Sequence, residues 1–368
     1  MVKGLVINGF DGNGVFVSGT TTSNRIEGNF IGIDPSGTLN RGNELYGVIF
    51  VGRGVSQGVV GGTTPAARNL ISGNVEGGLF MGGGFSGAPA NSMRVQGNYI
   101  GTDRSGKEDL GNEGVGLDIE DATGTTVGGT TAATRNVISG NSSVGVHLIS
   151  GSGSRVVGNR IGTTASGTTA LGNGLGGVLI EGGSSDNQIG DGTTAGSNTV
   201  AFNGHDGVAV IGSVLGSTST GNEVSRNSIF SNGGLGIDLM GLGEDFFTDI
   251  ANKNDAGDAD SGPNNLQNKP VLTSAKAVSG TTTIKGKLDS TPGKSFVVRF
   301  FSNPSGTDEG KKFIGQKSVN TGSDGNTGTF TFSPASKVAA GQTITATATK
   351  SATGDTSGFS TPRTVASS

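Results

Sequence analysis

The chain of 368 residues contains no cysteine and no tryptophan, and only two tyrosines. The lack of cysteine excludes disulfide bonds and metal sites built from thiolates. Aromatic residues make up 5% of the sequence, which counts against a sugar-binding groove lined with stacking rings. No stretch approaches the roughly 20 apolar residues of a membrane helix, and the first four residues lack the apolar run of a signal peptide.

Positive charge is scarce in the first 270 residues, which carry 14 Lys and Arg against 24 Asp and Glu, a net charge of −10. Residues 271–368 carry 11 against 5, a net charge of +6. A basic surface interleaved with aromatic residues, as nucleic-acid binding requires, is missing, so we expect no nucleic-acid partner. The change of charge predicts two domains, residues 1–270 and 271–368.

Glycine is abundant, with 71 residues, and much of it recurs at fixed positions beside Val, Ile and Leu. A glycine followed by alternating apolar residues occurs eight times, at intervals of 29 to 38 residues: Gly14, Gly47, Gly78, Gly116, Gly145, Gly177, Gly207 and Gly236. Stacked repeats of this length are typical of solenoids. Each repeat contains two further strand signals, so we expect an all-β solenoid of about eight triangular coils.

The alternation divides each repeat into an inward and an outward set of residues. The first inward residues should form one buried row: Val15, Val48, Leu79, Leu117, Val146, Val178, Val208 and Ile237. The outward set includes Phe16, Ile49, Val51 and Phe80, an apolar stripe at the N-terminal end. Such a stripe is normally covered. We expect the loop Gly82–Asn91 to cover it, with self-association as the second interpretation.

Four outward residues farther along have side chains suited to catalysis: Asp118, Glu120, His147 and Glu181. On neighbouring coils they would lie within about 5–10 Å of one another. Two carboxylates and a histidine on a rigid sheet suffice for general acid–base chemistry on a sugar chain. The alternative interpretation is that a strand facing solvent carries polar residues because it is wet. The sequence leaves open whether the protein is an enzyme.

Asparagines recur at the strand ends in two columns: Asn29, Asn98, Asn159 and Asn227 in one, and Asn74, Asn141 and Asn203 in the other. An asparagine side chain can satisfy backbone groups in a turn and can bond to its equivalent about 4.8 Å away in the next coil. We interpret both columns as structural ladders.

The repeat ends in an acidic segment, residues 236–270, which should close the last coil. It contains Glu244, Asp245 and Asp249, and then a denser group that could direct oxygens at calcium: Asp255, Asp258, Asp260 and Asn264. The full EF-hand pattern is absent. A cap rich in carboxylates without a bound ion is the other interpretation.

From Val271 onward glycine thins out and short strands with period two follow one another: Thr281–Lys287, Ser295–Phe301, Thr327–Phe332 and Thr343–Thr349. This spacing predicts a small antiparallel sandwich. The stretches Phe296–Pro304 and Gly341–Thr349 resemble immunoglobulin-like modules of bacterial surface proteins. That resemblance implies a spacer or binding module.

The blocks Asn-x-Ile-x-Gly-Asn, Ile-Gly-Thr-Asp and Val-Gly-Gly-Thr-Thr resemble the right-handed parallel β-helix repeat proteins of bacteria, across residues 1 to about 270. The resemblance implies an extracellular or cell-surface protein of the structural or adhesion type, acting as a rigid spacer or binding scaffold. Its partner would be a polysaccharide or another surface protein. An extracellular polysaccharide lyase or glycoside hydrolase is the alternative, because fold alone does not determine activity.

Overall fold

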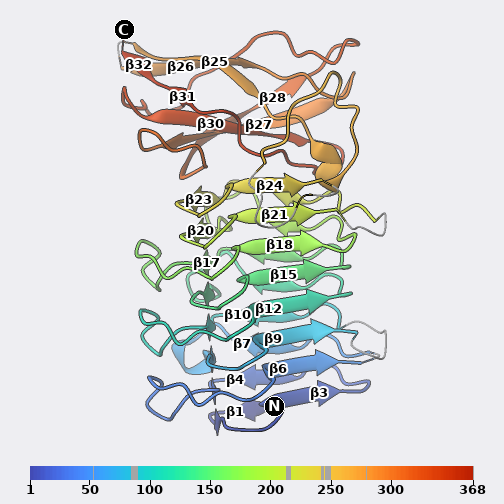
Figure 1. Ribbon diagram of the computed structural model, residues 1–368, viewed down its shortest axis with the longest axis vertical. Coiled ribbons are helices and arrows are strands. Elements are labelled where there is room, and N and C mark those ends of the chain that lie inside the picture. Colours follow the sequence, from blue (N-terminus) through green and yellow to red (C-terminus); the bar gives the residue numbers. More distant parts are fainter. Residues whose placement is uncertain are drawn as a thin grey trace.

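The computed structural model describes residues 1–52, 54–83, 90–212, 217–241, 244, 250–278 and 280–367. Strands β1 to β24 form three parallel sheets of eight strands each, and successive strands along the chain alternate between the sheets. The sheets wind into one column of about seven complete turns (Figure 1). The predicted all-β parallel β-helix is therefore confirmed.

The three sheets differ in strand length, and sheet C has the longest strands. Sheet A contains β1 (Val2–Lys3), β4 (Arg25–Glu27), β7 (Val59–Gly61), β10 (Arg94–Gln96), β13 (Thr126–Gly128), β16 (Arg155–Val157), β19 (Gln188–Ile189) and β22 (Glu223–Val224). Sheet B contains β2 (Val6–Ile7), β5 (Phe30–Ile31), β8 (Leu70–Ile71), β11 (Tyr99–Ile100), β14 (Val137–Ile138), β17 (Arg160–Ile161), β20 (Thr199–Ala201) and β23 (Ser228–Phe230). Sheet C contains β3 (Val15–Ser18), β6 (Tyr46–Val51), β9 (Gly77–Gly82), β12 (Val115–Glu120), β15 (Val146–Ile149), β18 (Val178–Glu181), β21 (Val208–Ile211) and β24 (Ile237–Met240).

The core of the column is a stack of aliphatic rows, and the predicted register of sheet C is confirmed. Leu117 is fully buried and pairs with Leu79 on one side and Val146 on the other. All eight residues of the predicted inward row are buried. A glycine precedes each residue of this row, and the next coil lies too close to it for a larger residue. A Cβ on Gly116 would lie 2.7 Å from the carbonyl oxygen of Gly145 in the next coil, closer than real Cβ contacts allow.

Two continuous asparagine ladders run along the corners of the column, as predicted, and each is more complete than the sequence suggested. The first contains Asn29, Asn69, Asn98, Asn136, Asn159, Asn198 and Asn227, and the second contains Asn43, Asn74, Asn112, Asn141, Asn173, Asn203 and Asn232. In each step the backbone N–H and the side-chain amide of one asparagine donate to Oδ1 of the next. The ladders therefore tie every coil to its neighbour inside a buried environment.

Three loops of similar shape project from the column at every second coil. Each is closed by an antiparallel bridge, Ile33 to Asn40, Thr102 to Asp109 and Thr163 to Ala170. The loops also contact one another, because Arg104 N–H donates to the carbonyl of Gly37 and Ala165 N–H donates to that of Gly106.

The C-terminal region consists of two four-stranded sheets that share one apolar core. One sheet has the order β29 (Phe330–Phe332), β26 (Thr281–Lys287), β25 (Val271–Val278) and β32 (Ala366–Ser367). The other has the order β28 (Lys312–Asn320), β27 (Ser295–Asn303), β30 (Thr343–Lys350) and β31 (Arg363–Thr364). The ring of Phe300 stacks on that of Phe332 at 4.3 Å between the sheets. Whether this region is immunoglobulin-like remains a prediction.

The C-terminal sheets continue the column beyond β24 (Figure 1). Two short 3-10 helices complete the described elements, η1 (Pro65–Ala67) in a loop and η3 (Pro263–Leu266) beside β24. Leu266 and Phe359 pack against the last aliphatic row of the solenoid. The end of the solenoid core is thus covered by side chains from the segments that follow it.

We predict that Asn141→Ala destabilises the protein by on the order of 3 kcal/mol, because it leaves the buried backbone N–H of Asn112 without its acceptor and removes one of the two donors to Asn173 Oδ1. Urea denaturation followed by circular dichroism measures the change. The exposed Asn320→Ala is the control and should change stability by less than about 0.5 kcal/mol. Equal effects of the two substitutions would contradict the ladder's role.

Candidate functional site

The structure brings together three of the four residues predicted to be catalytic, on the outer face of sheet C. Asp118 of β12 pairs in register with His147 of β15, and Glu181 of β18 reaches back toward the same imidazole. His147 Nδ1 lies 3.4 Å from Asp118 Oδ1, and His147 Nε2 lies 2.9 Å from Glu181 Oε1. The histidine is therefore held between carboxylates from the coils on either side.

The two carboxylates determine the charge of this histidine. Burial alone would lower the pKa of His147, but the hydrogen bonds and charges of Asp118 and Glu181 outweigh it and raise the pKa to about 9. The hydrogen bond from His147 lowers the pKa of Glu181 in turn. At neutral pH both ring nitrogens carry protons and face carboxylates, so His147 has no free lone pair with which to act as a general base.

Access to these groups is restricted. Asp118 is only 8% exposed, although its position in the strand alternation faces outward. Its neighbours are Phe80, its partner on the adjacent strand β9, and Tyr46. Burial and the charge of Asp118 raise the pKa of Tyr46. The side chains of Asp118 and His147 are each only 12% exposed. The geometry resembles an electrostatic cross-link between coils more than an open active site.

Glu120, the fourth predicted residue, lies at the end of β12 and is half-buried. Burial raises its pKa, and the nearby charges of Asp121 and Asp118 add to the effect. A carboxylate with a raised pKa can act as a general acid. Among the four, Glu120 therefore keeps the property that a catalytic role would need.

The predicted apolar stripe is exposed mainly at its N-terminal end. Phe16 is 59% exposed, whereas Ile49, Val51 and Phe80 are half-buried. The ring of Phe80 lies 5.4 Å from that of Tyr46, which covers part of it. Residues 84–89 of the expected covering loop lie outside the described residues. Self-association through this stripe stays a prediction.

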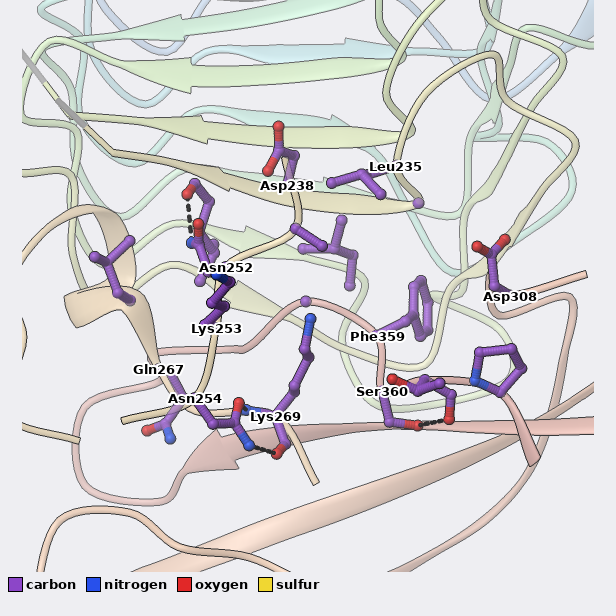
Figure 2. Close-up of a pocket in the computed structure, with 18 residues that line it drawn as sticks. Leu235, Asp238, Asn252, Lys253, Asn254, Gln267, Lys269, Asp308, Phe359 and Ser360 are labelled. Carbon is purple, nitrogen blue, oxygen red and sulfur yellow. Dashed lines mark hydrogen bonds between the residues drawn. The ribbon is translucent and has the colours of Figure 1, made fainter. Parts of the chain in front are cut away.

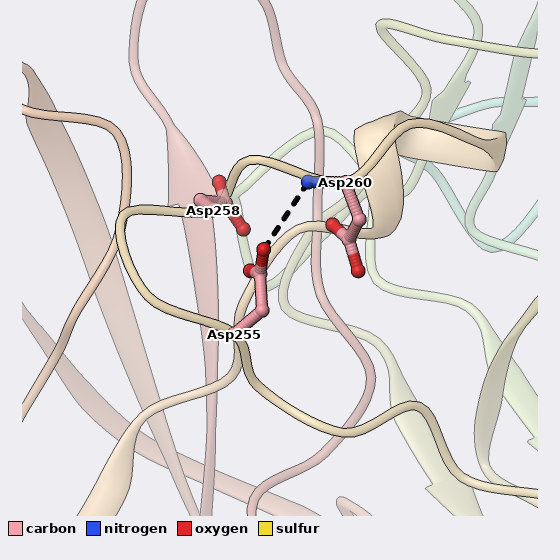
Figure 3. Close-up of side chains that lie close together, drawn as sticks. All are labelled: Asp255, Asp258 and Asp260. Carbon is pink, nitrogen blue, oxygen red and sulfur yellow. Dashed lines mark hydrogen bonds between the residues drawn. The ribbon is translucent and has the colours of Figure 1, made fainter.

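Three of the four predicted calcium ligands form a cluster between the solenoid and the C-terminal sheets (Figure 3). One carboxylate oxygen each from Asp255, Asp258 and Asp260 lies within 4.8 Å of the others. Oδ2 of Asp255 accepts hydrogen bonds from the backbone N–H groups of Ala259 and Asp260. Burial raises the pKa of Asp258 and of Asp260, and the charge of Asp255 adds to both shifts.

The structure does not bring Asn264, the fourth predicted ligand, into this cluster. Its Oδ1 accepts from the backbone of Asn222, and its amide donates to the carbonyls of Asn222 and Thr356. The side chain is thus used in a third, shorter asparagine ladder at the end of the solenoid. Glu244 bonds to the backbone of Gly241, and the predicted acidic residues Asp245 and Asp249 lie outside the described residues.

A pocket of about 240 Å³ lies where the last coil meets the C-terminal sheets (Figure 2). Asp238 of β24 and Lys269 line it, together with Phe359 and Ser360 from the C-terminal region. Burial lowers the pKa of Lys269, and the charge of Asp238 opposes this shift. Because both regions contribute to its lining, the pocket belongs to the junction between them.

No family model matches the sequence, and no curated protein matches it. Among solved structures, the Dettilon tailspike protein aligns with 89% of this chain and 72% of its own chain, at 14% sequence identity and a TM-score of 0.33. Among the described residues, no helix has the length and apolar character needed to cross a membrane.

We predict that the His147 ion pairs stabilise the fold in a pH-dependent way. A folded pKa of about 9 against an ordinary value of 6.5 gives a contribution of at most about 3 kcal/mol. It should be complete below pH 6.5 and lost as the pH rises through about 9. Thermal melting of the wild type and of His147→Gln between pH 5 and 10 should show the largest difference at the acid end of this range.

The chain has one other histidine, His205, and His205→Gln serves as the control. This variant keeps the ion pairs of His147 and leaves a single imidazole in the NMR spectrum. In that variant the remaining imidazole signal should titrate near pH 9 by NMR. A titration midpoint at or below pH 6.5 would contradict the assignment.

We predict that Asp255, Asp258 and Asp260 bind calcium with low affinity, because a hard cation would relieve the repulsion among carboxylates that otherwise share a half-buried site. Calcium at 10 mM, about tenfold above a dissociation constant of the order of 1 mM, should raise the melting temperature by a few degrees. Asp260→Asn should reduce this increase, whereas Asp324→Asn on the C-terminal surface should not. If calcium leaves the melting temperature unchanged, the acidic segment is a cap without a bound ion.

Proposed function

We propose that the protein is an extracellular or cell-surface scaffold of the structural or adhesion type, in which the solenoid is a rigid spacer that carries the C-terminal sheets. The observation that carries this proposal is the continuation of the solenoid's hydrogen-bond ladders into the C-terminal region. The location outside the cell rests on the resemblance of the repeats to those of bacterial surface proteins.

The second asparagine ladder does not stop at the last coil. The backbone N–H and the side-chain amide of Asn232 both donate to Glu309 Oε1, at 3.3 and 2.8 Å, as an asparagine of a further coil would accept them. Next to this contact, Ile229 of β23 and Gly310 exchange two backbone hydrogen bonds of 3.0 and 2.9 Å. Glu309 is buried, and burial raises its pKa. The C-terminal region therefore takes the place of a coil.

Two further contacts fix the same junction. Arg299 of β27 forms a 2.6 Å ion pair with Glu223 of β22, and its side chain is only 7% exposed. A second guanidinium nitrogen donates to the hydroxyl of Thr349. The ring of Phe359 packs so closely on Gly236 that a Cβ there would lie 2.8 Å from a ring carbon. A junction of packed and hydrogen-bonded side chains supports a rigid extension, because a flexible tether would lack such contacts.

The alternative is an extracellular polysaccharide lyase or glycoside hydrolase that acts through the outer face of sheet C. One observation favours it, the raised pKa of Glu120, which suits a general acid. The double pairing of His147 and the burial of Asp118 weigh against it. Turnover of a polysaccharide that Glu120→Gln abolishes would make this alternative the better description.

We predict that the solenoid and the C-terminal sheets keep one fixed separation in solution. Because the chain has no cysteine, spin labels can be placed at Ala132→Cys in the solenoid and Lys317→Cys in β28 without other changes. Double electron–electron resonance should give one narrow distance distribution. Glu309→Ala should broaden it by removing the acceptor for Asn232, whereas the exposed neighbouring Asp308→Ala should not.

A broad distribution in the protein without Glu309→Ala would contradict the rigid scaffold. Circular dichroism and melting of both variants show whether the regions themselves remain folded, so that loss of the junction is distinguished from loss of the fold.

A further inference from the structure

The outer face of sheet A carries a row of arginines. Arg25, Arg94 and Arg155 occupy the same register position on β4, β10 and β16, which are every second strand of the sheet. Val59 and Thr126 fill the positions between them. Since neighbouring strands lie about 4.8 Å apart, the three guanidinium groups recur about every 10 Å along the column.

These arginines are only weakly engaged by the protein's own acids. Arg25 lies 3.5 Å from Glu27, and its side chain is 45% exposed. Arg155 lies 3.9 Å from a carboxylate oxygen of Asp191 and is 48% exposed. Arg94 is exposed and has no ion pair among the described residues. Arg155 Nε also donates to Gln188 Oε1 at 2.9 Å. Exposed ion pairs of this length contribute little, so the remaining N–H groups of the three arginines are available to an external anion.

The arginines of the row line two hollows on the same face. The first, of about 440 Å³, is lined by Ser23, Arg25, Gln57, Val59, Ser92 and Arg94. Ser23, Gln57 and Ser92 share a corner at which each adopts a positive φ near 55°, which stacks two hydroxyls and an amide beside the arginines. This arrangement offers cationic groups together with neutral groups that can bond to alcohols.

The second hollow, of about 500 Å³, lies at the far end of the row and reaches the C-terminal sheets. Arg155 and Gln188 line its solenoid side, and Lys350 lines the opposite side. Two acids also line it, Asp186 and Glu223, and Glu223 is already paired with Arg299. A ligand that follows the arginine row would therefore meet both regions of the protein at this end.

We propose that this face of sheet A binds a linear acidic polysaccharide along the column axis. The inference rests on the proposed scaffold function, to which it adds a partner. A polysaccharide with one carboxylate or sulfate in each disaccharide presents its charges at wide, regular intervals, as the arginines do. Guanidinium groups bind such anions through paired N–H donors, and the hydroxyls of the corner suit neutral sugar alcohols.

A nucleic acid fits the same face poorly. Its phosphates recur about every 3.4 Å along a strand, so most would find no partner in this row. Binding of single strands also depends on aromatic side chains that stack on bases, and the outward column of sheet A contains none: Arg25, Val59, Arg94, Thr126, Arg155, Gln188 and Glu223. The net charge of −10 over residues 1–270 would repel a dense polyanion beyond the row.

The test is a calorimetric titration of the whole chain with a hyaluronan decasaccharide, which has one carboxylate in each disaccharide. Neutral dextran oligosaccharide and a 20-nucleotide thymidine strand are the comparison probes. We expect saturable hyaluronan binding that weakens as salt is raised. The triple variant Arg25→Gln, Arg94→Gln, Arg155→Gln should bind about tenfold more weakly or not at all.

The matched control removes the same charge from exposed arginines elsewhere, with Arg41→Gln, Arg104→Gln and Arg363→Gln. It should bind hyaluronan as the wild type does, and both triple variants should melt within a few degrees of it. Equal binding by the two triple variants, or no binding by the wild type, overturns the proposal. Tighter binding of the thymidine strand overturns the choice of a polysaccharide. In each case the spin-label distances still test the scaffold independently.

Discussion

The interaction on which this structure depends is the hydrogen bond from each corner asparagine to its equivalent in the next coil. A coil of three short strands leaves the backbone groups of its corners without partners, and these corners are buried. One side chain that both donates and accepts can satisfy them, provided that the next coil places an acceptor beside it. The ladders through Asn141 and Asn159 therefore make each coil depend on its neighbours.

The same in-register stacking decides how charge can be arranged on the surface. Equivalent positions lie about 4.8 Å apart, so like charges on successive strands would repel each other. Sheet C avoids this repulsion by placing the cationic His147 between Asp118 and Glu181. Sheet A avoids it by separating its arginines with uncharged residues such as Val59 and Thr126. On sheet C the opposite charges pair with one another, whereas on sheet A the positive charges stay available to a ligand.

The sequence was sufficient to predict what depends on strict periodicity. From the glycine spacing and the apolar alternation we could predict the inward row that contains Leu117. The same pattern predicted that Asp118 lies beside His147. The double pairing of His147 could not be predicted from the register, because Glu181 lies opposite Ile149 on the next strand and its side chain reaches diagonally to His147. Asn264 was predicted as a metal ligand, but it completes a ladder with Asn222 instead. Nothing in its local sequence shows that a corner of the last coil needs an acceptor there.

We infer that the ladders bind the solenoid and the C-terminal sheets into one cooperative unit. The most direct measurement is native-state hydrogen exchange of the Asn232 amide, which donates to Glu309, compared with the Asn141 amide in the middle of the column. In a single cooperative unit the two amides should have comparable protection. Exchange at Asn232 as fast as in an exposed loop, with Asn141 still protected, would show that the junction opens independently and that the two regions are not one cooperative unit.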